Sequence, residues 1–210
     1  IWTVIPGVVI IVLIGFGIFQ WTEVMNIDES EDPIVIEVYA KQFAWQARYA
    51  GADNTLGLGN VNFIDETNNP IGVDMTDAAS LDDKPVSELH LPKGKKVLFK
   101  FRSQDVLHSA YMPHFRAQMN CVPGMVTQFG FTPKYTTEEM RQQSEVMDKT
   151  RGINKIRSEK GEDLYEFDYV LLCNKICGAS HYSMQMKIVV EEEEEYNKWL
   201  AEQPTYAEKL

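Results

Sequence analysis

The chain of 210 residues carries 20 Lys and Arg against 31 Asp and Glu, a formal net charge of −11 at pH 7. This excess of negative charge argues against nucleic acid and anionic lipid headgroups as partners, and it favours a basic partner. The average composition, 44% hydrophobic and 24% charged, conceals a division, because residues 1–22 contain no charged side chain. We therefore expect a short apolar segment followed by one domain long enough to bury its own core.

The apolar segment has the length and composition of a membrane-spanning helix. Its roughly 20 residues would extend about 30 Å as a helix, which is the thickness of a bilayer hydrocarbon core. Trp2 at one end, and Phe19 with Trp21 at the other, are placed like interfacial aromatic anchors. A signal peptide is disfavoured because neither a basic n-region nor a small-residue cleavage site is visible. We predict a transmembrane helix over residues 1–22. Because the chain opens on Ile1 rather than Met, we expect that an upstream segment has been removed and that it includes another helix.

An acidic linker is predicted over residues 23–32. It contains Glu23, Asp28, Glu29, Glu31 and Asp32, and no Lys or Arg occurs before position 41. The positive-inside rule counts basic residues, so their absence here places the following domain on the non-cytoplasmic side of a membrane. That compartment permits disulfide bonds.

Residues 33–210 are predicted to form a mainly β domain. Alternation of apolar and polar side chains, which is typical of strands, occurs at 34–38, 43–49, 97–101, 126–131, 165–171 and 184–190. Several short strands with polar turns favour a β-sandwich or barrel. Three other segments interrupt or follow them: a surface excursion over 50–86, an exposed helical insertion at about 134–163, and a short amphipathic helix after Glu191.

One window near the end of the chain carries the chemistry. Cys173, Cys177, His181 and Met184 follow the spacing C-x3-C-x3-H-x2-M on a loop between two predicted strands. Thiolate, thioether and imidazole ligands together select copper, and a blue-copper site uses one Cys, two His and a weak axial Met. Two thiolates are one too many for that site, but they can bridge two copper ions, each completed by one His and a weaker ligand. His108, which follows a predicted strand, is our candidate for the second imidazole.

Two other interpretations of these residues remain open. Cys173 and Cys177 can form a disulfide in an oxidising compartment, which would leave Cys121 unpaired. A structural zinc ion held by two Cys and two His is chemically reasonable, but it leaves Met184 without a role. Ordinary structural roles are expected for the remaining candidates, Cys121, His90 and His114.

Further stretches of the chain match one known family. They are DVLHS at 105–109, VPG at 122–124, QFAWQARY at 42–49 and the opening IWTVIPGVV at 1–9. With the cysteine window, they make the chain similar to subunit II of haem–copper cytochrome c oxidases. The resemblance implies a cupredoxin-like β-sandwich that carries a binuclear copper centre, CuA. It also implies a location in the bacterial inner membrane, or an equivalent energy-transducing membrane, with the domain on the extracytoplasmic side. Such subunits usually have two spanning helices, and the opening of this chain resembles the second.

The same resemblance implies a ligand set. Cys173 and Cys177 would bridge both copper ions, and one imidazole, from His108 or His181, would complete each ion. The weak ligands would be the Met184 thioether and the backbone carbonyl of Lys175.

The chain departs from the family pattern at three positions. Lys175 stands where the family usually has Glu, whose carboxylate also binds magnesium at the border with the catalytic subunit. An ammonium group cannot ligate a metal, and Asn120 replaces an Asp near that border, so we do not expect magnesium to be held there in the usual way. Phe43 stands where relatives often have a Trp that receives electrons, while Trp45 is retained. Phe43 and Trp45 are therefore our candidates for electron uptake.

The function implied is that of the electron-transfer subunit of a terminal respiratory oxidase. Such a subunit takes electrons from cytochrome c at CuA and passes them to haem in catalytic subunit I of a proton-translocating enzyme that reduces oxygen to water. No haem is expected on this chain, since C-x-x-C-H is absent. The expected partners are subunit I, other oxidase subunits, membrane lipid and a cytochrome c that is soluble or part of a supercomplex. The alternatives are a membrane-anchored copper-binding or chaperone protein and the CuA domain of a nitrous-oxide reductase. A quinol oxidase subunit is disfavoured because such relatives lack the copper ligands.

Overall fold

The computed structural model describes residues 1–25 and 32–209. The chain divides into two compact units, Ile1–Asp32 and Pro33–Leu210. Most of the predicted acidic linker, including Asp28, Glu29 and Glu31, lies outside the described residues.

The first unit contains one long helix. Helix α1 (Val4–Met25) has 22 residues and a mean hydropathy of 2.3, which makes it long and apolar enough to cross a membrane. Pro6 lies in its first turn, where the missing N–H of proline has no intrahelical partner to lose. The helix begins three residues later than the predicted segment and continues to Met25, past the first charged side chain, Glu23.

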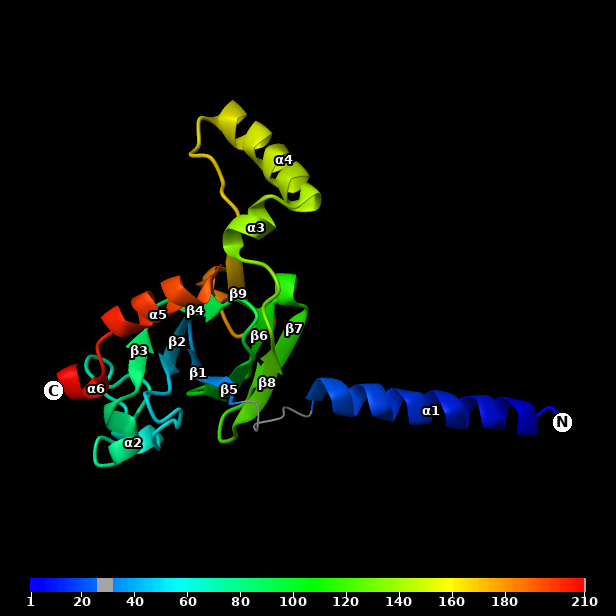
Figure 1. Ribbon diagram of the computed structural model, residues 1–210, viewed down its shortest axis with the longest axis horizontal. Helices are drawn as coiled ribbons and strands as arrows, with labels where there is room; N and C mark the ends of the chain where they lie inside the picture. The colour runs from blue at the N-terminus through cyan, green and yellow to red at the C-terminus, as the bar shows by residue number, and fades with distance from the viewer. Residues whose placement is uncertain (26–31, 210) are drawn as a thin grey trace. The chain divides into compact units, whose positions relative to one another are not determined.

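The second unit is a sandwich of two sheets (Figure 1), so the mainly β sandwich predicted from the sequence is confirmed. Within the described residues, each sheet has five strands. Sheet one has the order β3 (Lys84–Val86), β2 (Ala44–Tyr49), β1 (Ile34–Lys41), β5 (Val97–Ser103), β8 (Thr127–Phe131). Sheet two has the order β4 (Leu89–Pro92), β10 (Gln185–Glu191), β9 (Tyr169–Cys173), β6 (His108–Met112), β7 (Ala117–Cys121).

The core between the sheets follows from side-chain alternation along the strands. In β1, Ile36 and Val38 point into the core, where they join Phe99 of β5 and residues of the opposite sheet such as Leu171 and Ile188. All five residues are fully buried. The core therefore fixes the two sheets face to face.

The other face of sheet one buries a charged cluster. Arg48 is 1% exposed, and it donates to Glu37 at 2.7 Å and to Asp83 at 2.6 Å. Arg102 donates to the second carboxylate oxygen of Glu37. Because each buried charge has an opposite partner, the cluster ties β1, β2, β5 and the segment before β3 together.

Two segments differ from the sequence-based expectations. The predicted strand 165–171 begins only at Tyr169, because the backbone N–H and C=O of Tyr165 are both bonded to the side chain of Asn154 instead of to a neighbouring strand. The excursion 50–86 is not simply a surface loop. Its residues Ile71 and Val73 are buried in a second apolar cluster with Tyr39.

The helices of the second unit lie in the segments that connect or follow the strands. The insertion holds α3 (Thr137–Arg141) and α4 (Ser144–Lys160), and α3 begins with a capping box between Thr136 and Glu139. The chain closes with α5 (Glu193–Glu202), which buries Tyr196, and α6 (Tyr206–Lys209). Short helical segments occur at α2 (Ala78–Leu81), η2 (Val61–Phe63), η3 (Pro113–Phe115) and η4 (His181–Ser183).

Candidate metal centre

Strand pairing brings the predicted ligands to one end of sheet two. Strands β6 and β9 are antiparallel, so His108 at the start of β6 lies near Cys173 at the end of β9. Strand β10 is antiparallel to β9 as well, and Met184 immediately precedes it. The loop between β9 and β10 carries Cys177 and His181. The six groups that the sequence singles out are therefore brought together by two strand pairings and one loop.

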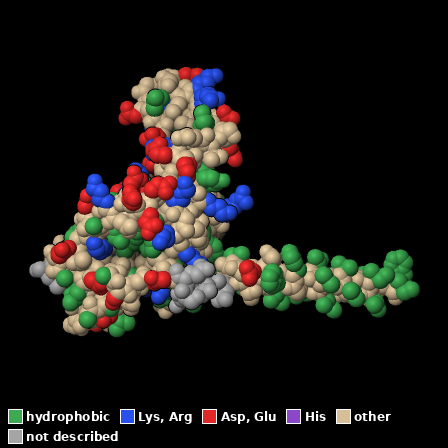
Figure 2. Space-filling view, viewed as in Figure 1, with side chains coloured by type: hydrophobic (Ala, Val, Ile, Leu, Met, Phe, Trp, Pro, Cys, Tyr) green, Lys and Arg blue, Asp and Glu red, His purple; other side chains and the backbone are tan. Residues whose placement is uncertain are grey.

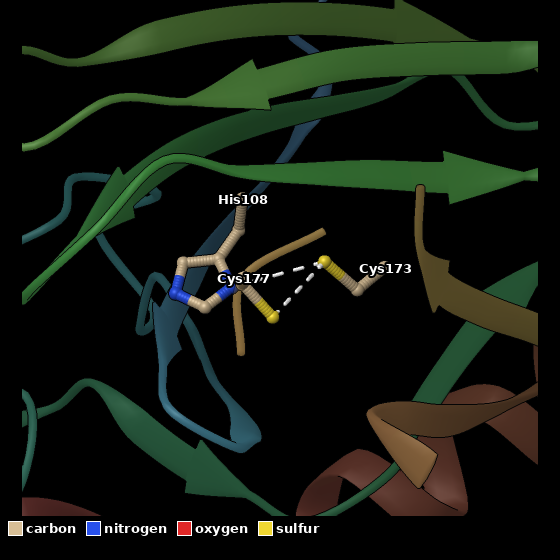
Figure 3. Close-up of side chains that lie close together, drawn as sticks. All are labelled: His108, Cys173 and Cys177. Carbon is tan, nitrogen blue, oxygen red and sulfur yellow. Dashed lines mark hydrogen bonds between the residues drawn. The ribbon is translucent and has the colours of Figure 1, made fainter. Parts of the chain in front are cut away.

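The two sulfur atoms face each other with an imidazole on either side. Cys173 Sγ and Cys177 Sγ are 3.8 Å apart, and both thiols are free. His108 Nδ1 lies 3.8 Å from Cys173 Sγ, and His181 Nδ1 lies 3.6 Å from Cys177 Sγ. Figure 3 shows the two sulfur atoms turned toward each other beside the His108 ring.

Two weaker donors complete the group. The backbone carbonyl oxygen of Lys175 lies 3.2 Å from Cys173 Sγ, while its side chain is exposed. Met184 Sδ lies 3.9 Å from Cys177 Sγ and is buried. A carbonyl ligand is indifferent to the side chain, so Lys at position 175 leaves this donor intact.

A hydrogen-bond network orients His108. This ring is 0% exposed, and its Nε2 lies 2.9 Å from Oδ1 of Asp105, so that Nδ1 faces the sulfur atoms. Asp105 also accepts from the backbone N–H groups of Gln42 and Val106, both at 2.7 Å. Burial raises the pKa of Asp105, but the hydrogen bonds from His108 and the two N–H groups outweigh it and hold the pKa below its usual value. Such a carboxylate fixes the tautomer of a metal-binding imidazole.

The turn between β1 and β2 supports the cysteine loop. Gln42 Nε2 donates to the carbonyl oxygen of Cys177. Gly178 has φ +145°, and a Cβ atom there would lie 2.8 Å from two ring carbons of Phe43. Glycine is thus required at 178 both by the backbone conformation and by the close approach of the turn.

The spacing of the donor atoms can be compared with that of a single metal site. A single tetrahedral ion with bonds of about 2.0 Å to nitrogen and 2.3 Å to sulfur needs ligand atoms roughly 3.3–3.8 Å apart. Among the described residues, the group whose ligand atoms all lie within 4.8 Å of one another consists of His108, Cys173 and Cys177. His181 is outside that group although it approaches Cys177. His108 and His181 therefore lie beside different sulfur atoms of the pair.

Burial governs the ionisation of the thiols. Burial, together with the neighbouring Cys173, raises the pKa of the Cys177 thiol to about 11. Cys121 lies opposite His108 on β7, and burial raises the pKa of its thiol to about 12. Buried thiols of this kind ionise when a bound cation compensates the charge, so a metal ion bound by them would displace their protons.

The two candidates for electron uptake lie beneath the loop. Trp45 is buried, its ring lies edge-on to that of His108 at 6.2 Å, and its Nε1 donates to the carbonyl oxygen of Met184 at 3.4 Å. Phe43 is half-buried in the turn before β2, so it lies just outside the strand, which was predicted over 43–49 and begins at Ala44. Tyr182, which the sequence analysis did not single out, is 87% exposed next to His181.

The other histidines have structural surroundings. His90 stacks on Trp199 with ring centroids 3.9 Å apart, and its Nδ1 lies 2.7 Å from Glu191. His114 packs edge-on against Phe167 at 4.8 Å. Gln42 and Asp105 are the supporting residues that sequence reasoning missed. Asp105 stands in the DVLHS stretch and was used there only to recognise His108.

Comparison with known proteins gives consistent matches. The family model described as "Cytochrome C oxidase subunit II, periplasmic domain" matches residues 34–157, and this match ends before the cysteine loop. The alternative cytochrome c oxidase subunit 2 of Bradyrhizobium diazoefficiens is 34% identical over 203 residues, which are 96% of this chain and 61% of the relative. Cytochrome c oxidase subunit 2 of Alkalihalophilus pseudofirmus is 24% identical over 205 residues, which are 95% of this chain and 42% of the relative. This chain therefore spans less than two thirds of either relative.

A comparison with solved structures gives a weaker match. The crystal structure of the periplasmic domain of subunit II of cytochrome oxidase of Bradyrhizobium japonicum is 17% identical, with a TM-score of 0.46. The alignment covers 80% of this chain and 91% of that chain.

Proposed function

The chain belongs to the cytochrome c oxidase subunit II family, and from this premise we propose that it is the electron-receiving subunit of a terminal respiratory oxidase. Its cofactor is a binuclear copper centre, CuA. Its electron donor is a cytochrome c, and its acceptor is haem in the catalytic subunit, where oxygen is reduced and protons are translocated.

One observation carries the proposal: two free, buried thiols lie 3.8 Å apart with an imidazole nitrogen within 4 Å of each sulfur. The proposed ligands are His108, Cys173, the Lys175 carbonyl, Cys177, His181 and Met184. Soft sulfur donors combined with imidazole favour copper over zinc, magnesium or calcium. When bound, the centre would supply a one-electron carrier held by these residues.

The protein's own residues hold and insulate the donors. Asp105 keeps the His108 ring in one tautomer, and Gln42 fixes the loop at the carbonyl of Cys177. Full burial of His108 and near-complete burial of Met184 exclude water from one side of the site. Donors held in this way are already in place before the metal arrives, which lowers the cost of binding.

Burial of the donors also bears on the alternative of a copper chaperone. A chaperone must surrender its metal, which requires ligands that a partner can reach. Here His108, Cys173, Cys177 and Met184 are all buried. The site therefore favours retention of the metal over its transfer.

Electron uptake is proposed at Phe43 and Trp45. Trp45 touches the site through its hydrogen bond to the Met184 carbonyl, and Phe43 lies against Gly178 of the loop. Replacing each by Leu removes the π-system and keeps the bulk. We expect slower electron transfer from the donor with an unchanged copper spectrum; loss of stability with unchanged donor rates would instead assign both rings to packing.

The remaining proposals concern the membrane, the neighbouring subunits, magnesium and the electron donor. Helix α1 anchors the chain in the bacterial inner membrane or an equivalent membrane, with the domain on the extracytoplasmic side, in contact with subunit I and other oxidase subunits. Magnesium at the subunit border is not held by Lys175, whose exposed ammonium cannot ligate it. The net charge of −11 suits a basic cytochrome as donor.

The test is the metal content of the full chain after copper reconstitution in detergent. We expect two coppers per chain and, in the oxidised form, a purple spectrum with an EPR signal from one electron shared by both ions. Cys173→Ser and Cys177→Ser should each abolish that spectrum. Cys121→Ala, which removes a buried thiol on the neighbouring strand, should keep it. One metal per chain, preferential zinc binding, or a two-copper spectrum in either serine variant would refute the proposal.

A further inference from the structure

Helix α4 buries very little of its own surface. Val146 alone among its residues, all of which the structure describes, is buried. Isolated helices of this length are marginal in water, and most helical stability in proteins comes from packing of one face. This helix stands away from the two sheets (Figure 1). Its exposed face is thus a surface that a partner can cover.

The charge of α4 is opposite to that of the chain. Residues 149–158 carry four basic side chains and no acidic one, in a chain with a net charge of −11. The basic residues are Lys149, Arg151, Lys155 and Arg157. In Figure 2, Lys and Arg lie at the outer end of the projection that contains α4, with some Asp and Glu beside them, and Asp and Glu are frequent where it joins the sandwich.

An open groove of about 1050 Å³ runs between α4 and the extended segment 164–167. One stripe of the helix lines it, at positions i, i+4 and i+8: Met147, Arg151 and Lys155. Leu164 lines the opposite wall. Met147 is 44% exposed and Leu164 is 68% exposed, so apolar side chains stand uncovered beside basic ones.

Some of the basic side chains that line the groove have no strong ion pair with an acidic side chain of the groove. Arg141 and Glu166, which also line it, pair with each other at 3.1 Å, and Arg141 is further paired with Asp168. Arg151 pairs with Asp148 at 3.0 Å, but both side chains are highly exposed, and such a pair contributes little and exchanges readily. Among the described residues, Lys155 has no ion pair. Two cationic groups are therefore available to a ligand.

We propose that this groove binds an extended acidic segment of a partner protein. Its carboxylates pair with Arg151 and Lys155, and its apolar side chains cover Met147 and Leu164. This surface is separate from the metal centre, and it selects a partner of opposite charge to the one that suits the rest of the chain.

The test measures binding of a fluorescein-labelled peptide of ten residues. Eight of them are Glu, and the two central ones are Leu and Phe. Fluorescence anisotropy with the full chain in detergent at physiological salt gives its Kd. Arg151→Glu combined with Lys155→Glu should weaken binding by about tenfold or more. Lys149→Glu combined with Lys160→Glu makes the same change of charge on the same helix outside the groove, and it should leave the Kd within about twofold.

A second pair of variants tests the apolar contacts. Leu164→Ser should weaken binding, whereas Ile156→Ser, which also removes an exposed aliphatic side chain from outside the groove, should not. Circular dichroism checks that each variant retains its helices. Equal loss of binding in the two charge variants would reduce the effect to general electrostatics and overturn the proposal. So would the absence of peptide binding up to about 1 mM, or binding to vesicles of anionic lipid in place of the peptide.

Discussion

Replacing Asp105 by Asn should weaken copper binding without unfolding the domain. The carboxylate holds the His108 ring through Nε2 at 2.9 Å and accepts from the backbone N–H of Gln42 with its other oxygen. Asn keeps the size of the side chain but presents an NH₂ group in place of one oxygen. Either the ring or the turn then loses its acceptor, and the negative charge that favours a fixed imidazole tautomer is gone.

The size of the effect follows from the bonds that are lost. A hydrogen bond to a charged group contributes about 1.5–3 kcal/mol when it is removed from one side. Loss of the partner that orients a metal-binding imidazole typically lowers metal affinity about 10- to 100-fold, which is about 1.4–2.7 kcal/mol. The two figures agree, so we expect a loss of copper affinity in this range.

The assay is competition for copper between the full chain and a chelator of known affinity, followed through the absorption of the bound centre. Asp77→Asn is the matched control. Asp77 also accepts from two backbone N–H groups, at the start of α2, but it contacts none of the proposed ligands. If the two variants lost equal copper affinity, or if Asp105→Asn lost none, the orienting role of Asp105 would be refuted.

Four further predictions concern the metal centre and the buried charged cluster. Met184→Leu should keep both coppers but shift the reduction potential measured by spectroelectrochemistry, because weak axial ligands tune such sites; loss of both coppers would contradict this. Gly178→Ala should lose copper and cost on the order of 1–3 kcal/mol in stability, since its φ and a ring 2.8 Å away both exclude a Cβ. Gly94→Ala, with φ +77° but open space, should cost stability alone, and equal copper contents in the two alanine variants would refute the steric argument. Arg48→Met should lower the urea-measured free energy of unfolding by about 3–5 kcal/mol, because it leaves the buried Asp83 without its ion-pair partner and leaves Glu37 paired with Arg102 alone. Burial raises the pKa of Glu37, but its arginine partners outweigh this and hold it below 4.5; stability should therefore be lost as pH falls below about 4.5, and a flat profile would contradict the pairing.

The fold could be predicted where sequence pattern and burial agree. Strand β10 alternates throughout in burial and β5 alternates in its second half, and both lie where the sequence pattern places them. Strand β1 also lies where it was predicted, although six consecutive residues of it are buried. Strands β6 and β7 escaped notice, because the five residues from His108 to Met112 are nearly all buried and show no alternation. The opposite error occurred at Tyr165, where alternation was present but the side chain of Asn154 took both backbone groups.

Some residues of the candidate site could be predicted from the sequence and others could not. Cys173, Cys177, His181 and Met184 could be found because they lie in one short window with a spacing that copper sites use. His108 was reached by a topological argument, that a strand-end loop meets the cysteine loop. Gln42 could not be predicted, since its contact with Cys177 spans 135 positions and depends on how one sheet packs over the other.

The proposed ligands come from two distant segments of the chain, the start of β6 and the loop between β9 and β10. Cys173 and Cys177 are four positions apart, so their loop can form as soon as it is synthesised, whereas His108 and Cys173 are separated by 65 positions. Bringing such distant groups together carries the entropy cost of closing a long loop, which is met only when β6 pairs with β9. The full donor set therefore depends on the pairing of β6 with β9. Any opening that separates these two strands would part His108 from the sulfur atoms while leaving the cysteine loop continuous.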